Sequence, residues 1–421
     1  MNKRLVLMIT VSLILGGVML WAAPGRDAGD SVTIEIVQWW QPQMRAGSFD
    51  RVISDFEAKN SDIRVRSINL PFSEMLNQIT IGNASGTLSD VIGVNPPWLS
   101  DFIKQGIVEP LDDYIVRDRF DESLLANKLV IDDKQWIFLI TTFLYPLFYN
   151  LDHFQAAGLA GPPGNWNEFI DYARRLTVPA RNQYGWVIPM ALSLPNGAQH
   201  EVLSWAWSGG DRALRDNSPN LENPGVRAAV NHVFTLFNEG AILPGALTKT
   251  EQEKNEDFAN GRVSMMISSI ALINQIRERN PNLRFDIAMV PGPVGYTGRP
   301  GLSMAGWAIG MSRMGRNKEA SWKLIKHFMD TEQNSFISSN ANAFPGNRNS
   351  TPDFVSTDAL FAKAFEMYQR SDLVNEFMGQ PNAPGLQRAL MEELHALFEG
   401  RQNIDATLRN AQAKWTEIYG R

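Results

Sequence analysis

The sequence predicts an α/β fold, because segments with the period of strands alternate with segments that have the period of amphipathic helices. Residues 32–40 (VTIEIVQWW) and 63–68 (IRVRSI) alternate apolar and polar side chains, whereas residues 49–59 carry apolar side chains at helical spacing. A helix over 74–84 and a strand at 90–94 follow. The first hundred residues therefore predict successive βαβ units.

A second region repeats the alternation. Residues 135–150 (QWIFLITTFLYPLFYN) predict two joined strands, because Pro146 breaks the apolar run, and a domain boundary is expected near this point. Residues 291–301 (PGPVGYTGRPG) form the densest Gly/Pro segment and predict a linker or a domain crossing. Further strands are expected at 261–267, 284–290 and 302–311, and further helices at 166–176, 201–208, 226–238, 270–279, 318–329 and through most of 354–419.

Composition narrows the class of protein. The chain has 421 residues, 44% hydrophobic and 20% charged, which is typical of a globular protein of two or three domains. Its 39 basic and 45 acidic residues give a net charge of -6, so no basic surface for nucleic acid is expected. The absence of cysteine excludes disulfides, thiolate metal sites, cysteine nucleophiles and a lipid anchor on an N-terminal cysteine.

The N-terminus has the pattern of an export signal. Lys3 and Arg4 precede an apolar run over 5–20, so residues 1–23 are expected to be a signal peptide or an uncleaved N-terminal anchor. Cleavage is expected near Ala22 or Ala23, although neither site has the usual pair of small residues. The sequence contains no other run of 18 or more apolar residues.

Motifs for catalysis or metal binding are missing. The five histidines never occur at a metal-ligand spacing such as HExxH, and the chain has no GxxxxGK[ST], GxGxxG or GxSxG motif. The acidic run 251–257 lacks the ligand pattern of an EF-hand loop and predicts a solvated helix start. We therefore expect no enzyme, no metal and no cofactor.

Tryptophan is abundant, with 12 residues, and several fall where strands or helices are expected to end. In open α/β sheets the ligand crevice lies beyond the carboxyl ends of the strands, so aromatic residues there can line it. Core packing is the competing interpretation for every one of them. The tryptophans concerned are Trp39, Trp40, Trp98, Trp205, Trp207 and Trp307.

Carbohydrate is the ligand class that such a crevice suits. A pyranose has a C–H face that packs on a flat ring, and a rim of hydroxyl groups that need oriented hydrogen bonds. Amide, carboxylate and guanidinium side chains supply those bonds. The polar candidates near the aromatic positions are Gln41, Asn95, Asp211 and Arg348, each of a type that is more often an ordinary surface or capping residue.

The order of these features resembles the family 1 extracellular solute-binding proteins of ABC importers, the maltose-binding-protein-like group. The resemblance extends over nearly all residues after the signal, and it depends on the order and spacing of the segments rather than on one motif. The matching segments are VTIEIVQWW, DFEAKNSDIRV, GTLSDVIGVN with FIKQGIVEPLDDYI, PLFYNLDHFQAAGLAGPPGNWNEFIDYARRLT, LSWAWSGGD, FANGRVSMMIS, AGWAIGMSRMGRNKEASWKLIKHFM and AFPGNRN.

The resemblance implies a two-lobe periplasmic-binding-protein fold of type II, with a ligand cleft between the lobes at a multi-strand hinge. It implies one lobe from residues 31–143 and 293–344 and another from 145–290 and 348–421. By position, it implies ligand contacts from Trp39, Trp40, Gln41, Asn95, Tyr145, Trp205, Trp207, Asp211, Trp307 and Arg348.

The resemblance also implies a function. We expect a periplasmic, monomeric subunit that binds a small molecule, a sugar or related solute, and delivers it to a membrane permease. Ile270 stands where many relatives carry an aromatic residue, which removes a stacking contact there. A sensory binding protein that presents its ligand to a receptor remains open from the sequence, as does a glycoside hydrolase.

Overall fold

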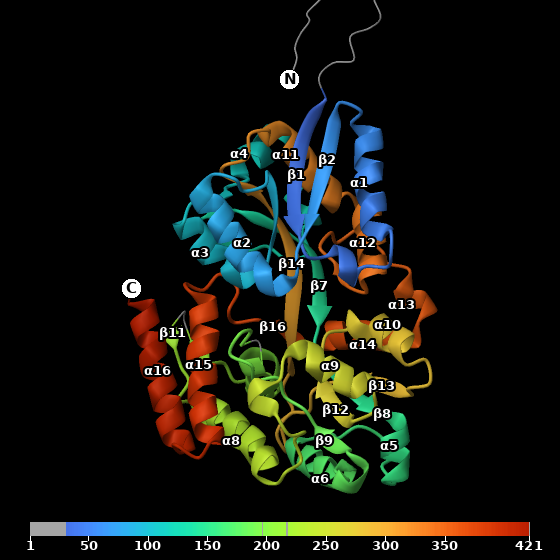
Figure 1. The fold of residues 1–421 in the computed structure, drawn as a ribbon, viewed down its shortest axis with the longest axis vertical. Helices are drawn as coiled ribbons and strands as arrows, with labels where there is room; N and C mark the ends of the chain where they lie inside the picture. Colours follow the sequence, from blue (N-terminus) through green and yellow to red (C-terminus); the bar gives the residue numbers. More distant parts are fainter. Residues whose placement is uncertain (1–30, 196, 216–217, 421) are drawn as a thin grey trace, which may run out of the picture.

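Two β-sheets organise the described part of this computed structural model, residues 31–195, 197–215 and 218–420. The larger sheet has the order β15-β7-β14-β3-β1-β2, with β4 and β16 also paired to β14. The smaller sheet has the order β13-β8-β12-β9. Figure 1 shows them one above the other, so we call the body around the larger sheet the first lobe and the other body the second lobe.

The first lobe begins with the predicted βαβ units. Strand β1 (Val32–Gln38) is parallel to both β2 (Ile63–Asn69) and β3 (Val91–Val94). The crossover helices are α1 (Ser48–Lys59) and α2 (Phe72–Ser85). The apolar face of α1 that predicted this helix is buried against the lobe. Gly86, which was predicted to end the next helix, ends α2 in the left-handed conformation.

Three crossings join the lobes. Strand β7 (Ile137–Leu144) pairs in the first sheet, and β8 (Leu147–Asn150) continues from it into the second. The start of β14 (Gly301–Ser312) pairs with β16 (Asp372–Val374), and its remainder pairs with β3 and β7. The third crossing follows β15 (Phe344–Pro345), which pairs with β7.

The remaining elements cover the two sheets. In the first lobe they are η1 (Gln41–Gln43), η2 (Pro96–Trp98), α3 (Leu99–Lys104), β4 (Val108–Glu109), α4 (Asp112–Asp118), η3 (Glu122–Leu124), β5 (Val130–Ile131), β6 (Lys134–Gln135), α11 (Lys318–Met329) and α12 (Thr331–Ala341). In the second lobe they include α5 (Leu151–Ala156), α6 (Trp166–Leu176), η4 (Pro179–Arg181), β9 (Tyr184–Trp186), η5 (Ala198–Leu203), α7 (Ser204–Ser208), β10 (Leu214–Arg215) and β11 (Ser218–Pro219). They continue with α8 (Pro224–Asn238), η6 (Ala246–Thr248), α9 (Glu251–Ala259), β12 (Val263–Ile267), α10 (Leu272–Arg279), β13 (Phe285–Ala288), α13 (Phe354–Thr357), α14 (Ala359–Arg370), α15 (Ala383–Phe398) and α16 (Ile404–Tyr419).

Most predicted elements occur, with local corrections. The first strand ends at Gln38 rather than at Trp40, because the Gln38 side chain accepts the backbone N–H groups of Trp40 and Gln41 in place of a strand partner. The predicted helix 201–208 begins as the π-helical turn η5 before it becomes α7. The acidic run starts α9 with a capping box, as a solvated helix start would, although Lys254 and Asp257 within it are buried.

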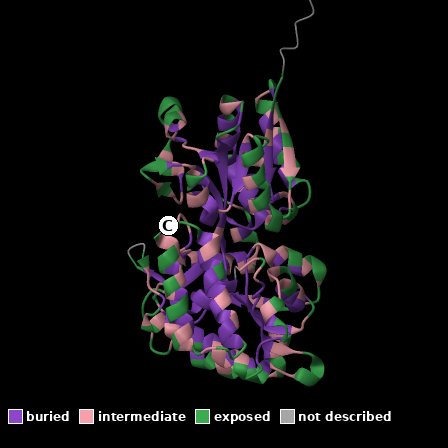
Figure 2. Ribbon diagram, turned by 60° about the vertical axis from the view of Figure 1, so that its left-hand side comes forward, coloured by how far each residue is buried: buried purple, intermediate pink, exposed green. Residues whose placement is uncertain are grey.

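Buried residues fill the centre of each lobe and continue through the crossing strands, as Figure 2 shows. One hydrophobic cluster thus extends through both lobes. The predicted signal or anchor, residues 1–23, lies outside the described residues. Within the described ranges, no helix is both long and apolar enough to cross a membrane.

Candidate functional site

The carboxyl ends of β1 and β3 form the first part of the site. These strands are parallel and adjacent, so the residues that follow them meet at one edge of the sheet. Trp39 follows β1 and Trp98 closes the turn after β3, and their ring centroids are 6.1 Å apart. Phe72 stacks on Trp98 at 5.4 Å. The strand ends named by the sequence therefore carry a shared aromatic group.

Trp40 and Trp307 extend this group toward the crossing strands. Their rings are stacked with centroids 5.7 Å apart, and Phe143 meets Trp307 edge-on at 4.9 Å. Gly93 on β3 makes the packing possible, because a Cβ there would lie 3.1 Å from the Trp40 ring and 3.2 Å from the Trp39 ring. We call Trp39, Trp40, Phe72, Trp98, Phe143 and Trp307 the aromatic cluster.

Polar contacts across the lobes lie beside the aromatic cluster. The Ser100 hydroxyl donates to the carbonyl of Gly379, and the Asn382 N–H donates to the Asp101 carboxylate at 2.9 Å. Burial raises the pKa of Asp101 above its usual value, and the Asn382 hydrogen bond opposes this shift. Asn95, next in the chain to η2, is half-buried, and its side chain has no hydrogen bond to a described residue. Its amide is therefore available to a ligand at the junction.

The second lobe presents buried amides on the other side of this junction. Asn382 immediately precedes helix α15 and caps it, because its side-chain oxygen accepts the Gly385 N–H. One turn further on, the Gln387 side chain donates to the Gln199 side chain at 2.8 Å. Because α15 also contacts η2, these amides and the aromatic cluster belong to the same junction between the lobes.

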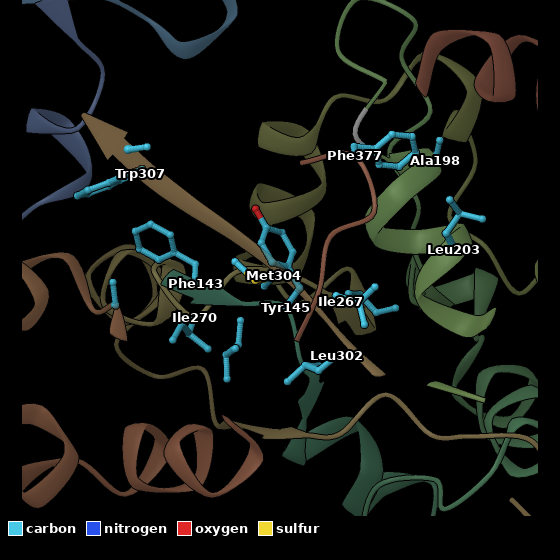
Figure 3. Packing of buried hydrophobic residues seen from close by; sticks show 14 of the residues in the cluster. Phe143, Tyr145, Ala198, Leu203, Ile267, Ile270, Leu302, Met304, Trp307 and Phe377 are labelled. Atoms are coloured by element: carbon cyan, nitrogen blue, oxygen red, sulfur yellow. The ribbon is translucent and has the colours of Figure 1, made fainter. Parts of the chain in front are cut away.

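Tyr145 lies at the crossing between β7 and β8, beside Met304 and Leu302 of β14 (Figure 3). Its ring is parallel to the His200 ring, with centroids 3.8 Å apart. Burial raises the pKa of Tyr145 well above its usual value, and a hydrogen bond with Ser269 opposes the shift. Tyr145 is therefore a neutral residue that joins the crossing strands to the second lobe.

Trp205 and Trp207 require a correction, because the structure places both inside the second lobe. They lie near the end of α7, as predicted, but both are fully buried. Trp205 packs against Phe169, Trp186 and His232 in the core of the lobe. The Trp207 indole N–H donates to Glu376, which also accepts the N–H groups of residues 213 and 214. Packing and internal hydrogen bonds therefore account for both rings.

The polar candidates divide in a similar way. Gln41 is half-buried in η1, and its amide donates to Asp50. Asp211 is exposed and lies against the start of α8, where a Cβ on Gly225 would overlap its carboxylate. Arg348 is exposed, and its guanidinium donates to the carbonyls of residues 125 and 126. Of this group, only Gln41, the first residue of η1, and Asn95, which follows β3, therefore lie at the edge of the sheet that carries the aromatic cluster.

Other cavities and charged groups lie away from the junction. A cavity of about 530 Å³ lies along α15 and α16, and one of about 720 Å³ lies in the first lobe beside Tyr114 and Trp136. Neither is lined by a residue predicted to bind ligand. Among the described residues, no group of three His, Asp or Glu side chains is arranged to hold a metal ion. The junction therefore brings together buried aromatic rings, amide side chains and the Asp101 carboxylate.

Sequence reasoning missed part of the junction. Gln199, Gln387 and the Ser100 and Asp101 pair were not predicted as site residues, although Trp98 was noted as a strand-end aromatic. Asn382 followed two residues later by a proline is a sequence signal for the start of α15. The sequence does not show that this helix start faces the first lobe, because that depends on the third crossing.

Comparisons with known proteins give one family. The profile described as "Bacterial extracellular solute-binding protein" matches residues 42–335 of the chain. A protein of Brucella abortus named as a binding protein is 27% identical over 411 residues, covering 96% of each chain.

Solved structures give the same architecture. An ABC substrate-binding protein of Listeria monocytogenes in complex with cycloalternan aligns with a TM-score of 0.79 at 20% identity, covering 93% of this chain and 100% of that one. Maltose-bound MalE3 of T. maritima aligns with a TM-score of 0.76 at 19% identity, covering 92% and 100%. These likenesses confirm the two-lobe α/β fold of type II that the sequence predicts.

Proposed function

Because the chain belongs to the family of bacterial extracellular solute-binding proteins, we propose that it is the carbohydrate-binding subunit of an ABC importer. In this proposal the protein is a periplasmic monomer that binds a sugar between its lobes and passes it to a membrane permease. The relatives that bind cycloalternan and maltose support the choice of carbohydrate. We also propose lobe ranges of 31–143 with 293–344, and 145–290 with 348–421.

The observation that carries the carbohydrate proposal is the aromatic cluster beside neutral amides. In this proposal Trp39 and Trp98, which pack together and are 5% and 6% exposed, meet the C–H face of a sugar at the edge where the Asn95 amide has no described partner. Gln41 follows Trp40 in the chain, and Gln199 is hydrogen-bonded to Gln387 at the same junction. The amides of Gln41 and Gln199 carry both donors and acceptors. This combination suits a ligand with many hydroxyl groups.

Lobe closure is the proposed mechanism. Contacts such as those of Asp101 with Asn382 join the first lobe to the second, and a ligand that touches both lobes adds to them. Such a ligand binds the closed form better and shifts the hinge equilibrium toward it, and a permease can then distinguish loaded from empty protein. No bond is made or broken, so we propose binding without turnover.

Ligand binding can be tested directly with purified protein. Native mass spectrometry first looks for a retained small molecule, and calorimetry then measures affinity over a panel of monosaccharides, oligosaccharides, polyols and sugar phosphates. Binding of at least one sugar without release of products supports the proposal. Hydrolysis of glycosides during the same incubations contradicts the proposal of binding without turnover.

Asn95→Ala tests the placement of the site. Removal of one ligand hydrogen bond is expected to weaken sugar binding about 3- to 10-fold. Asn167→Ala on the exposed face of α6 is the matched control and is expected to bind as the parent does. Equal affinities for both variants contradict a ligand contact at Asn95.

A further inference from the structure

The π-helical turn η5 lies beside the crossing strands. Its residues 198–203 are all buried, and the turn leads directly into α7. Gly197 permits its position, because a Cβ there would fall 1.9 Å from the carbonyl oxygen of Pro189. Such wide turns cost stability relative to a regular helix and are frequent at functional sites. The side chains that η5 places beside the crossing strands are therefore candidates for a functional role.

His200, in the middle of η5, contacts both crossing strands. Its ring is parallel to that of Tyr145, with an angle of 2° between the planes and 3.8 Å between the centroids. Its Nδ1 lies 2.8 Å from the Ser303 hydroxyl on β14. The Tyr145 N–H donates to the Ser303 carbonyl at 2.9 Å, so the two strands are bonded to each other at the same level. One side chain of the second lobe thus holds both strands that lead into the first.

An ion pair holds η5 to the body of the second lobe. Lys254 of α9 lies 2.6 Å from the carboxylate of Glu201 and donates to the Ile267 carbonyl at the end of β12 at 2.8 Å. Both charged side chains are fully buried. The cost of separating such a pair keeps η5 fixed on α9 and β12. Movement of the second lobe is therefore transmitted through His200 to the crossing strands.

We propose that His200 is a positioning residue of the hinge, which clamps Tyr145 and Ser303 and sets the angle at which the lobes rest without ligand. The consequence for ligand binding rests on the proposed function, because a shift of the resting angle changes how much of the protein is ready to bind. The resting angle itself can be measured without any ligand.

His232 provides a matched control. It is a second buried histidine of the same lobe, packed against Trp205, Trp166 and Phe169. Its ring contacts are with residues of the second lobe alone. Alanine at either histidine removes a buried imidazole and lowers stability, but only the change at His200 removes a contact with the crossing strands.

The absence of cysteine allows site-specific spin labels at two introduced residues. Ile81→Cys on α2 of the first lobe is 59% exposed, and Asn167→Cys on α6 of the second lobe is also exposed. The distance between the labels is measured by pulsed electron spin resonance in the ligand-free protein. The parent is compared with His200→Ala, Ser303→Ala and His232→Ala, and each variant is also melted thermally.

The proposal predicts that His200→Ala and Ser303→Ala shift or broaden the distance distribution, whereas His232→Ala lowers the melting temperature and leaves the distribution unchanged. Superimposable distributions for all folded variants overturn it. If His200→Ala does not fold, the smaller change Ser303→Ala decides the outcome. Addition of sugar to the labelled parent tests the proposed function separately. If no sugar changes the distance in the parent, the proposed function fails, but the comparison of the ligand-free variants still tests the role of His200.

Discussion

The ring of Trp40 is stacked on the ring of Trp307, with centroids 5.7 Å apart and an angle of 21° between the planes. Trp40 follows the end of β1, and Trp307 lies in the middle of β14; these two strands are separated in the sheet by β3. They are 1% and 3% exposed, so each covers a face of the other. The strand-end position inferred for Trp307 from the sequence is therefore wrong, because the residue lies at mid-strand, where a register shift follows it.

Trp307→Ala is expected to destabilise the fold. Loss of a ring packed between Trp40 and Phe143 leaves a cavity, and the expected cost is about 3–5 kcal/mol in the free energy of unfolding. Denaturant unfolding measures this cost, and Trp307→Phe, which keeps a ring, is the control with a smaller loss. A variant as stable as the parent but with weakened sugar binding shows instead that Trp307 is a sugar platform in the cleft.

The sequence predicts secondary structure best where burial follows a simple period. Helix α11 occupies the range 318–329 that its pattern predicts, and β7 and β8 separate at Pro146. Helix α12 was not predicted, because polar Gln333, Asn334 and Ser338 occupy buried positions in it. The Asn334 amide donates to two backbone carbonyls, which makes its burial possible and hides the helix from a hydrophobic pattern.

The candidate site was predicted less completely than the fold. The rule that ligands bind beyond the carboxyl ends of strands led to Trp39 and Asn95, and the structure brings Trp39 into the aromatic cluster at that edge. The same rule cannot distinguish Trp205, because a tryptophan suits a core as well as a cleft. Gln199 and Gln387 are 188 residues apart and meet only through tertiary packing.

Gly93→Ala is expected to disturb the aromatic cluster. The added methyl group would lie 3.1 Å from the Trp40 ring and 3.2 Å from the Trp39 ring, so at least one ring must move. The expected loss is about 1–3 kcal/mol of stability, together with a change in tryptophan fluorescence. Gly161→Ala, at a glycine with open space at its Cβ position and no positive φ, is the control and is expected to leave stability and fluorescence as in the parent. Unchanged fluorescence in Gly93→Ala contradicts the packing.

The Glu201 and Lys254 pair is expected to be strongly coupled. Burial raises the pKa of the Glu201 carboxyl, and the neighbouring Lys254 ammonium opposes this shift. Lys254→Met leaves this carboxyl buried without its partner and is expected to cost about 3–5 kcal/mol. The double change Glu201→Gln and Lys254→Met is expected to cost less than the sum of the single changes. Additive costs in this double-mutant cycle contradict the coupling.

The buried histidines His200 and His232 are expected to contribute stability that rises with pH between about 4 and 6.5, whereas the raised pKa of Glu201 contributes in the opposite direction. Burial lowers the pKa of His200 to about 4 and that of His232 to about 3, from an ordinary value of 6.5. In this window the histidines of the unfolded chain bind protons that those of the folded chain do not. The stability that they contribute is therefore fully present above pH 6.5 and is lost as the pH falls. Each histidine contributes up to about 1.4 kcal/mol per pH unit.

Urea unfolding at several pH values measures this slope. His232→Phe removes one of the buried histidines and is expected to reduce the slope relative to the parent. A slope in His232→Phe equal to that of the parent contradicts the assignment to His232.

Asp101 is expected to influence closure. Its carboxylate accepts the Asn382 N–H across the junction, so Asp101→Ala removes a contact between the lobes. Sugar binding is expected to weaken about 3- to 10-fold, and Asp101→Asn, which keeps an oxygen acceptor, is expected to bind nearly as the parent does. Calorimetry compares the three proteins. Equal affinity of Asp101→Ala and the parent indicates that the contact plays no part in closure.

Solution scattering of the protein with and without a bound sugar tests ligand-driven closure most directly. A sugar is first identified by calorimetry and then added to saturation. The radius of gyration is predicted to fall, because contacts with both lobes favour the closed form. A radius that stays the same with every sugar, while a different class of solute reduces it, contradicts carbohydrate as the ligand of this protein.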